Sequence, residues 1–176
     1  MQSSRAEWNR FESPRLLIEK LHVSDFAFIN ELLNTEGFLK FIGDRNVRSD
    51  DDAKVYIAKT LENESIQYWV VKLKPELAPV GIVSFVKRDY LPCPDIGFAF
   101  LPRYTGKGFA FEAVNAALGR ILPECGNETV IAITDNDNAP SMRLLHKLGF
   151  KFKRELERDG KFLQVYEIDA GNIQGC

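Results

Sequence analysis

The sequence predicts a mixed α/β fold, with one mostly antiparallel sheet of about seven strands and about four helices packed on it. Three observations lead to this class. Residues 67–101 hold three β-rich runs separated by turn residues, which is typical of an antiparallel meander. The third run changes to a helical period after Gly108 and another strand follows, so the strands flanking that helix should be parallel. Near the end, Asp159-Gly160 separates two further runs, as a hairpin turn does.

Length and composition indicate a single domain. The chain has 176 residues, of which 45% are hydrophobic, and this is enough for one sizeable core. We assign residues 13–170 to that domain, residues 1–12 to a polar lead-in and residues 171–176 to a tail. The formal net charge of -2 argues against nucleic-acid binding by bulk electrostatics.

The cysteines and the N-terminus bear on the cellular compartment. Cys93, Cys125 and Cys176 are odd in number and follow no metal-ligand spacing, so we interpret them as structural or incidental thiols in a reducing compartment. No apolar run approaches membrane-spanning length, and residues 1–13 lack the apolar core of a signal peptide. We therefore expect a cytoplasmic protein, a monomer or homodimer, that binds neither nucleic acid nor membranes.

Local patterns place the elements of the N-terminal half. Residues 15–20 form the first predicted strand, and a helix capped by Ser24-Asp25 follows it. Residues 38–42 are interpreted as an apolar turn. Three acids at 50–52 begin the next helix, where the macrodipole favours them, so we interpret them as a solvated helix start rather than a metal site. The expected buried stripe of that helix is Ala53, Ile57 and Leu61.

The C-terminal half continues the meander and then crosses over. Strands at 67–74 and 80–86 flank a proline-containing turn and should pair antiparallel. The strand at 95–101 leads through a loop to a helix, and the strand at 129–134 comes next. A short helix with Pro140 in its first turn precedes the hairpin. The expected buried face of the helix after the loop is Ala110, Ala113, Val114, Ala117, Leu118 and Ile121.

The loop Arg103-Tyr-Thr-Gly106-Lys-Gly108 carries the first chemical signal. Its glycines let backbone amides turn toward a ligand, and the following helix start adds unpaired amides and a partial positive charge. The loop therefore predicts a phosphate cradle. The dinucleotide-binding fingerprint is incomplete, because Phe111 stands where its third glycine belongs.

A second motif, in residues 138–150, follows the strand expected to be parallel and reads Asn-x-x-Ser, then Lys-x-Gly-Phe. The loop at 103–108 has the form Gln/Arg-x-x-Gly-x-Gly/Ala. With both motifs in this order, the chain resembles the GCN5-related N-acetyltransferase (GNAT) family. Its Ser13-Pro-Arg-Leu is similar to the Thr-x-Arg-Leu of the RimJ/RimL branch. The resemblance covers residues 12–168, nearly the whole chain.

The resemblance implies a GNAT-like fold in which a splayed parallel pair of strands forms a slot for acetyl-CoA, the co-substrate, with no metal. The CoA pyrophosphate is expected on the loop amides, and the pantetheine arm along the strand before them. Gly97 is expected to supply a bulge that splays this strand. The residues implied in CoA binding are Phe98, Phe100, Leu101, Arg103, Tyr104, Thr105, Gly106, Lys107, Gly108, Phe109, Ala110, Asn138 and Ser141.

One residue expected of the family is missing. Many members carry a tyrosine that acts as acid toward the departing thiolate, but the corresponding position here is Leu145. His146 is adjacent, yet the next residue of a helix points about 100° away, so we interpret it as an exposed helix residue. Ser141 is the better candidate, because its hydroxyl can donate a hydrogen bond to the forming thiolate.

Asp95 is the candidate base. It begins the strand before the loop, where RimJ/RimL-like sequences usually have Glu, and a carboxylate there could accept a proton from the amine. The alternative interpretation is a strand-end acid that faces solvent, and the sequence does not choose between them. Glu112 also lies near the loop, but the electrostatics of a helix start explain it.

The acceptor is constrained by its pKa. An α-amino group of pKa about 8 is about 10% neutral at pH 7, whereas a lysine is neutral to only about 0.04%. A site without a strong base or acid therefore favours a protein N-terminus, or a small amine with a depressed pKa, over a lysine side chain. Four aromatic residues are candidates for either the acceptor pocket or the core: Phe38, Phe41, Trp69 and Tyr90.

These expectations describe an N-acetyltransferase that moves acetyl directly from acetyl-CoA to a primary amine, without a covalent enzyme intermediate. The acceptor is expected to be a protein or peptide N-terminus, as for ribosomal-protein-alanine acetyltransferases, or a small molecule. One alternative is a non-catalytic acyl-CoA-binding regulatory module, which Leu145 keeps open. Another is a nucleotide-binding domain without acyl chemistry.

Overall fold

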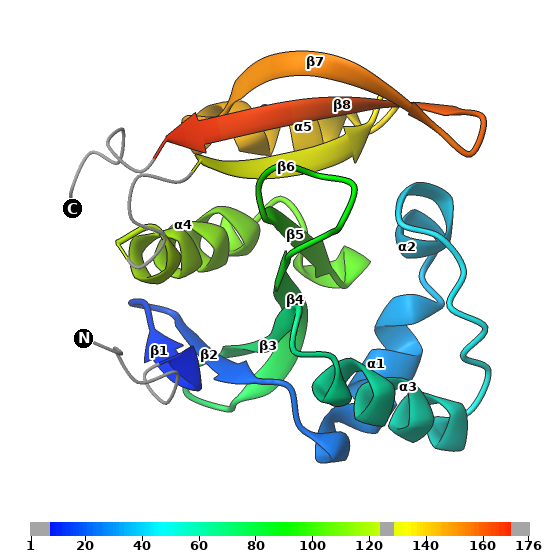
Figure 1. Cartoon of the computed structure of the whole chain (residues 1–176). Helices are drawn as coiled ribbons and strands as arrows, with labels where there is room; N and C mark the ends of the chain where they lie inside the picture. The colour runs from blue at the N-terminus through cyan, green and yellow to red at the C-terminus, as the bar shows by residue number, and fades with distance from the viewer. Residues whose placement is uncertain (1–7, 124–128, 170–176) are drawn as a thin grey trace.

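The computed structural model describes residues 8–123 and 129–169. In these residues eight strands form one mixed sheet in the order β1-β2-β3-β4-β5-β6-β8-β7, and five α-helices pack against it (Figure 1). The strands are β1 (Arg10–Glu12), β2 (Leu16–Lys20), β3 (Ile66–Leu73), β4 (Ala78–Val86), β5 (Asp95–Phe100), β6 (Thr129–Asp135), β7 (Lys151–Arg158) and β8 (Lys161–Asp169). The helices are α1 (Phe26–Leu33), α2 (Glu36–Phe41), α3 (Asp50–Glu62), α4 (Phe109–Ile121) and α5 (Ala139–Lys147).

The predicted fold class is confirmed, and the structure adds one strand and one helix to the expected numbers. The extra strand is β1, in the stretch interpreted as a lead-in, where buried Phe11 packs edge-on against Trp69 at a ring distance of 5.8 Å. The extra helix is α2, in place of the expected apolar turn, and Thr35 caps it. Both elements are too short to show a clear period in the sequence.

The two faces of the sheet are covered by different helices. Successive residues of a strand point to opposite faces. Along β3, Tyr68 and Val70 belong to the core under α1, α2 and α3, whereas Trp69 and Val71 belong to the core under α4 and α5. The sheet thus separates a three-helix side from a two-helix side. The position of a residue along its strand, odd or even, decides on which side its side chain lies.

The parallel pair β5–β6 opens like a V. β5 runs antiparallel to β4 over its whole length, but it pairs with β6 only at Asp95, opposite Ile131. The amide of Ile131 donates to the carbonyl of Pro94 at 3.0 Å, and the pairing ends there. β6 continues alongside β8 instead. The expected splay is therefore present, with its apex at Asp95.

The expected bulge at Gly97 is wrong. The β4–β5 register runs without a shift from Asp95 to Phe100, so the V does not come from an inserted residue. A Cβ on Gly97 would lie 2.8 Å from Oγ of Ser84 on the neighbouring strand. Glycine is needed here because the serine side chain approaches the backbone closely.

Other expectations have mixed outcomes. Ser49 caps α3 and the three acids occupy its first turn, as predicted, but Leu61 is exposed and not part of the buried stripe. The hairpin turn at Asp159-Gly160 is confirmed, with φ angles of 50° and 73°.

Cys93 packs against a small cluster with Leu91, whereas Cys125, Cys176 and the tail lie outside the described residues. Within residues 8–123 and 129–169, no helix is long and apolar enough to cross a membrane.

Candidate active site

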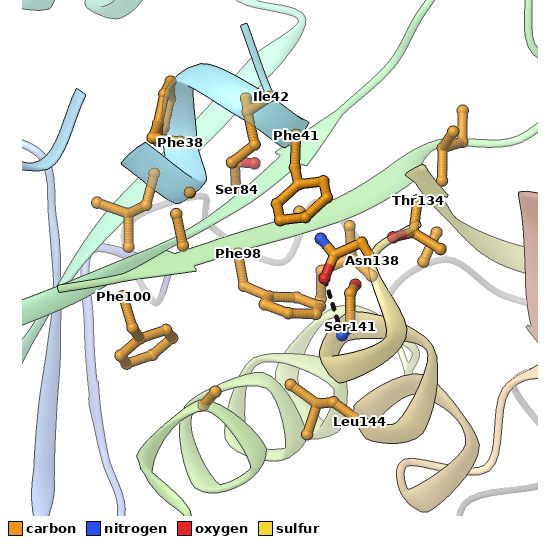
Figure 2. Close-up of a pocket in the computed structure, with 18 of the residues that line it drawn as sticks. Phe38, Phe41, Ile42, Ser84, Phe98, Phe100, Thr134, Asn138, Ser141 and Leu144 are labelled. Atoms are coloured by element: carbon orange, nitrogen blue, oxygen red, sulfur yellow. Dashed lines mark hydrogen bonds between the residues drawn. The ribbon is translucent and has the colours of Figure 1, made fainter. Parts of the chain in front are cut away.

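A cavity of about 1000 Å³ follows the V between β5 and β6 and continues to the three-helix side of the sheet. We call its two parts the loop end and the aromatic end. The loop end is formed by the β5–α4 loop, the start of α4 and the start of α5. The aromatic end is formed by α2, the α2–α3 loop, α3 and the facing strands; its aromatic residues are Phe38, Phe41, Tyr56, Tyr68 and Tyr90. Figure 2 shows the junction, where Phe41 faces Asn138 and Ser141 across the opening.

The loop end is a surface of backbone amides. Gly106 and Gly108 have φ angles of 74° and 80°, a region that other residues rarely adopt. Gly108 is the N-cap of α4, and no side chain caps this helix. The amides of its first turn have no intrahelical acceptors, and a Cβ on Gly106 would meet nothing within 4 Å. The loop is thus open toward a ligand, with donors pointing at it.

The loop is held in place by a segment from the far N-terminal side of the chain. Glu112 accepts hydrogen bonds from Ser13 Oγ at 2.7 Å, from the amide of Arg15 at 2.8 Å and from its Nε at 2.6 Å. Arg15 also donates to the carbonyl of Lys107 at 3.1 Å and lies over the ring of Phe109. Burial raises the pKa of Glu112, but the bonds from Ser13 and Arg15 outweigh it and hold the pKa below its usual value.

This anchor was missed in the sequence, where Glu112 was explained by helix electrostatics alone. The signal in the sequence is the Ser13-Pro-Arg-Leu motif, to which the sequence alone gives no physical role. Its role is to join β2 to the start of α4, next to the glycine loop.

Asp95 lies at the apex of the V and is 6% exposed. Arg88 Nε donates to its Oδ2 at 3.0 Å, while Oδ1 is buried and has no hydrogen-bond partner among the described residues. Burial raises the pKa of Asp95, and the positive charge of Arg88 offsets only part of that effect. A strand-end acid facing solvent is therefore wrong for this residue.

Asp95 belongs to the aromatic end. Residues directly opposite one another in adjacent strands share a face, as do alternate residues of one strand. Asp95 thus shares a face with Gly97, which is opposite Ser84, which is in turn opposite Tyr68. Tyr68 belongs to the core of the three-helix side. The carboxylate consequently lies on that side, while Phe98 projects from the other face of β5.

The opposite wall of the loop end comes from α5 and β6. Figure 2 shows Phe98 and Phe100 projecting from β5 toward Ser141 and Leu144. Asn138 caps α5, and its Oδ1 accepts from the amide of Ser141 at 3.2 Å. Thr134 of β6 also lines the cavity; it is 5% exposed, and its buried Oγ1 has no partner among the described residues.

Leu145, which stands in place of the missing tyrosine, and the adjacent His146 both have structural roles. Leu145 is fully buried and packs in the core under α4 and α5, with one side touching the cavity. His146 does not line the cavity, and its ring meets that of Tyr166 edge-on at 5.3 Å. His146 therefore does not take the place of the phenol.

Most residues expected to bind the co-substrate line the cavity: Phe98, Phe100, Tyr104, Thr105, Gly106, Gly108, Phe109, Ala110, Asn138 and Ser141. Three do not. Leu101 is fully buried, and the side chain of Arg103 pairs with Glu31. Lys107 presents its ammonium to the ring of Tyr104. These three positions border the site without projecting side chains into it.

Other residues line the cavity that sequence reasoning did not single out. Arg143 and Lys147 bring positive charge to the loop end, and Arg45 brings it to the aromatic end. They belong to no motif, and in the sequence a charged residue on a helix or loop cannot be distinguished from an ordinary surface residue. Trp69, one of the candidates for the acceptor pocket, is instead a core residue in contact with Phe11.

A splayed parallel pair, an amide-rich loop and an acid at the apex define an acyl-CoA-dependent transferase site. The family comparison agrees with that class. Residues 15–151 match the family model described as "Acetyltransferase (GNAT) domain", which covers most of the chain. The chain belongs to the GNAT acetyltransferase family and is an acetyl-CoA-dependent N-acetyltransferase.

Similar proteins agree with this assignment. An uncharacterized N-acetyltransferase of Bacillus subtilis, YnaD, is 28% identical over 156 residues, covering 86% of this chain and 91% of its own. Among solved structures, the ribosomal-protein-S5-alanine acetyltransferase of Vibrio fischeri superposes with a TM-score of 0.78 at 19% identity, covering 93% and 97% of the two chains. The spermidine N-acetyltransferase of Vibrio cholerae, solved with CoA and spermine, has a TM-score of 0.76 at 19% identity, covering 90% and 98%. These two structures share the fold.

The residues of the loop end fit acetyl-CoA. Left-handed glycines, first-turn amides and the cations Arg143 and Lys147 suit a pyrophosphate and other phosphate groups, and they lie at the open end of the V. Acetyl-CoA supplies an activated acetyl group as a thioester.

Proposed function

We propose that the protein transfers acetyl from acetyl-CoA to an amine of moderately low pKa, either the α-amino group of a protein or peptide N-terminus or a small amine, as a RimJ/RimL-like enzyme. The Ser13-Pro-Arg-Leu motif and its anchoring of the loop support the branch. The structural neighbours include both a protein-N-terminal and a polyamine acetyltransferase, so the acceptor has to be argued from this site.

In this proposal the CoA pyrophosphate binds the amides between Arg103 and Gly108. The pantetheine arm lies along the edge of β5 that faces away from β4, near Phe98 and Phe100. That edge supports the placement, because β5 has no partner strand there beyond Asp95 and its backbone groups are available to an extended ligand. The acetyl group then points toward the apex of the V, between Ser141 and the aromatic end.

Asp95 is the proposed base, and its burial on the acceptor side of the sheet supports that role. The amine nitrogen attacks the acetyl carbonyl carbon and the C–S bond breaks. The proton leaves the nitrogen for the carboxylate of Asp95, directly or through a water. Ser141 donates a hydrogen bond to the departing sulfur, which is enough help for a thiol with a pKa near 8.5.

The raised pKa of Asp95 suits this chemistry. A carboxylate whose pKa lies above its usual value is a stronger base, and the ion pair with Arg88 favours its ionised form. A base of this kind suits an α-amino group better than a lysine, because about 10% of the former is already neutral at pH 7.

The single observation that carries the proposal is a buried carboxylate at the apex of the slot, facing the acceptor side. The test is release of free CoA from acetyl-CoA with a panel of N-terminal peptides, amino acids, polyamines and lysine-containing peptides. We expect turnover with N-terminal peptides or with small amines of low pKa. Tight CoA binding without turnover on any amine would overturn the proposal in favour of a binding module.

A further inference from the structure

Among the residues that the structure describes, the aromatic end carries one unpaired cation. Four charged side chains within residues 8–123 and 129–169 line the cavity on this side of the sheet: Arg45, Arg88, Asp95 and Asp135, because Asp135 shares a face of β6 with Ile131, which is opposite Asp95. Arg88 and Asp95 form an ion pair, so their charges offset one another. Arg45 is exposed to solvent at the cavity mouth, and no hydrogen bond or ion pair of its guanidinium is found within the described residues. Asp135 accepts a hydrogen bond from the amide of Asp137 at 3.0 Å. In the described part of the chain, the cation without a partner at this end is therefore Arg45.

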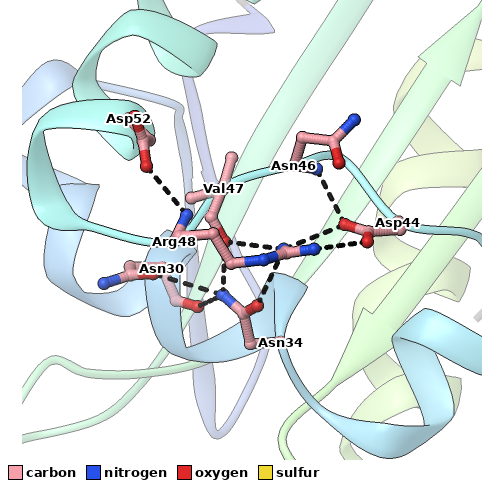
Figure 3. Close-up of polar contacts among 7 residues, drawn as sticks. All are labelled: Asn30, Asn34, Asp44, Asn46, Val47, Arg48 and Asp52. Carbon is pink, nitrogen blue, oxygen red and sulfur yellow. Dashed lines mark hydrogen bonds and ion pairs between the residues drawn. The ribbon is translucent and has the colours of Figure 1, made fainter.

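The loop on either side of Arg45 is fixed by its own contacts (Figure 3). Asp44 pairs with Arg48 and also accepts a hydrogen bond from the amide of Asn46 at 2.7 Å. Val47 is buried in the core of the three-helix side. Arg45 takes no part in this network. The backbone at Arg45 is therefore held in place by its neighbours, while its guanidinium makes none of these contacts.

The charge of Arg45 acts on the floor of the aromatic end. Burial raises the pKa of the Tyr68 hydroxyl well above its usual value, Tyr56 raises it further, and Arg45 opposes both. Arg45 thus lies close enough to this hydroxyl to act on it. The guanidinium, the two phenols and the rings of Phe38 and Phe41 bound one space on the acceptor side.

A polyamine fits this space poorly. An unpaired guanidinium repels an amine with several positive charges; of the two carboxylates that the described residues bring to this side, Asp95 is paired with Arg88 and Asp135 lies at the end of β6. An unpaired arginine beside aromatic rings suits a different ligand, one with a carboxylate on an apolar body, because guanidinium binds carboxylates through two parallel hydrogen bonds.

We propose that Arg45 binds an anionic group of the acceptor, which makes the acceptor an apolar or aromatic primary amine that also carries a carboxylate. Two sources have this chemistry: a free amino acid, and a peptide N-terminus followed by an acidic residue. The inference rests on the proposed function, since Asp95 receives the amine proton while Arg45 holds the anion. It assigns a specificity role to a residue that carries no motif.

The test compares acceptors with and without the anion, with kcat/KM expressed per neutral amine because a neighbouring carboxylate raises the pKa of an α-amino group. One pair is the amidated dipeptide Phe-Glu against amidated Phe-Gln, which share the same N-terminal residue. A second pair is phenylalanine against phenylalaninamide, and spermidine is a third arm. We expect kcat/KM at least tenfold higher for the anionic member of one pair. The pair that shows the preference identifies the source.

Three variants assign the preference to its residue. Arg45→Gln is expected to reduce the preference to threefold or less, while the Kd for CoA stays unchanged. Arg45→Lys should restore part of it, because the charge returns without the bidentate geometry. Lys40→Gln is the matched control: it removes an exposed cation from the same region that does not line the cavity, and it should keep the full preference.

The outcomes separate this inference from the proposed function. Turnover of many amines with no preference for the anion, faster turnover of spermidine, or a preference unchanged in Arg45→Gln would overturn the role of Arg45 alone. If no amine turns over, a thermal-shift measurement of anion binding tests the role of Arg45. N-acetylphenylalanine should raise the Tm of the CoA complex of the wild type and not that of Arg45→Gln. Equal shifts in both proteins would overturn the inference.

Discussion

The loop end of the cavity is formed by backbone groups, whereas the aromatic end is formed by side chains. The loop end consists of backbone amides, two left-handed glycines and a helix start, anchored by Arg15 and Glu112. The aromatic end consists of side chains from α2, α3 and the loop between them, with Asp95 at its base. Recognition by backbone amides requires glycine at the left-handed positions, whereas recognition by side chains can change with a single substitution. The co-substrate end is therefore set by the fold, and the acceptor end by the side chains of this particular protein.

The sharpest way to separate the two ends is to remove the acid at their junction. Asp95→Asn should lower kcat/KM by about 100-fold, the range for loss of a general base, and leave the Kd for CoA unchanged. The wild-type rate should fall as the pH drops through a pKa above that of an ordinary aspartate, because only the ionised form accepts the proton.

Asp89→Asn is the control for this prediction, since it removes an exposed acid from the same connection without touching the cavity. The measurements are steady-state kinetics from pH 4 to 9 and calorimetric titration with CoA. An Asp95→Asn enzyme with a wild-type rate and pH profile would reduce the residue to a structural partner of Arg88.

Gly108→Val tests the backbone nature of the loop end. The left-handed φ of 80° costs a residue with a side chain about 1–2 kcal/mol, so the loop should distort and CoA should bind about 5–30-fold more weakly. Gly119→Val is the matched control, because a Cβ at this site in α4 meets nothing within 4 Å and CoA affinity should be retained. Equal CoA affinity in both variants would contradict the placement of the pyrophosphate.

Ser141→Ala tests the help given to the leaving sulfur. Loss of one hydrogen bond to a developing charge should lower kcat by about tenfold, with little change in CoA affinity. The helix should remain intact, because Asn138 caps it through the amide of residue 141 and not through the hydroxyl. A wild-type kcat in this variant would contradict the proposed hydrogen bond from Ser141 to the leaving sulfur.

Arg15→Gln probes the support behind the loop and should have the smallest effect. The arginine of this ion pair with Glu112 is half exposed, so its loss should weaken CoA binding by about threefold and leave kcat unchanged. Arg10→Gln removes a comparable strand arginine whose carboxylate partners are 3.6 and 3.7 Å away, and should not affect CoA. A larger fall in kcat than in affinity would place Arg15 in the chemistry instead.

The same contrast explains what could be predicted from the sequence. The meander, the crossover helix, the hairpin turn and the glycine loop were predicted because periodicity and left-handed glycines are local signals. Strand β1 and helix α2 were missed because three and six residues are too few to show a period. The bulge assigned to Gly97 was wrong because a strand glycine can also serve a close approach, here by Ser84.

The environment of Asp95 could not be read from its neighbours in sequence. Its burial and its place at the apex depend on Ile131 of β6 and on the parity of three strands. Likewise, Glu112 meets Ser13 and Arg15 only when β2 packs beside α4. Contacts of this kind leave no periodic trace in the chain.

The anchor between Ser13 and Glu112 also sets an order of assembly. These residues are 99 positions apart, so one partner leaves the ribosome long before the other. Pairings this distant close late and slow the search for the native state. The glycine loop can therefore be synthesised and the meander formed before the co-substrate site is complete. A nascent chain shorter than about 112 residues has no finished cradle, and acetyl-CoA can stabilise the fold only after that point.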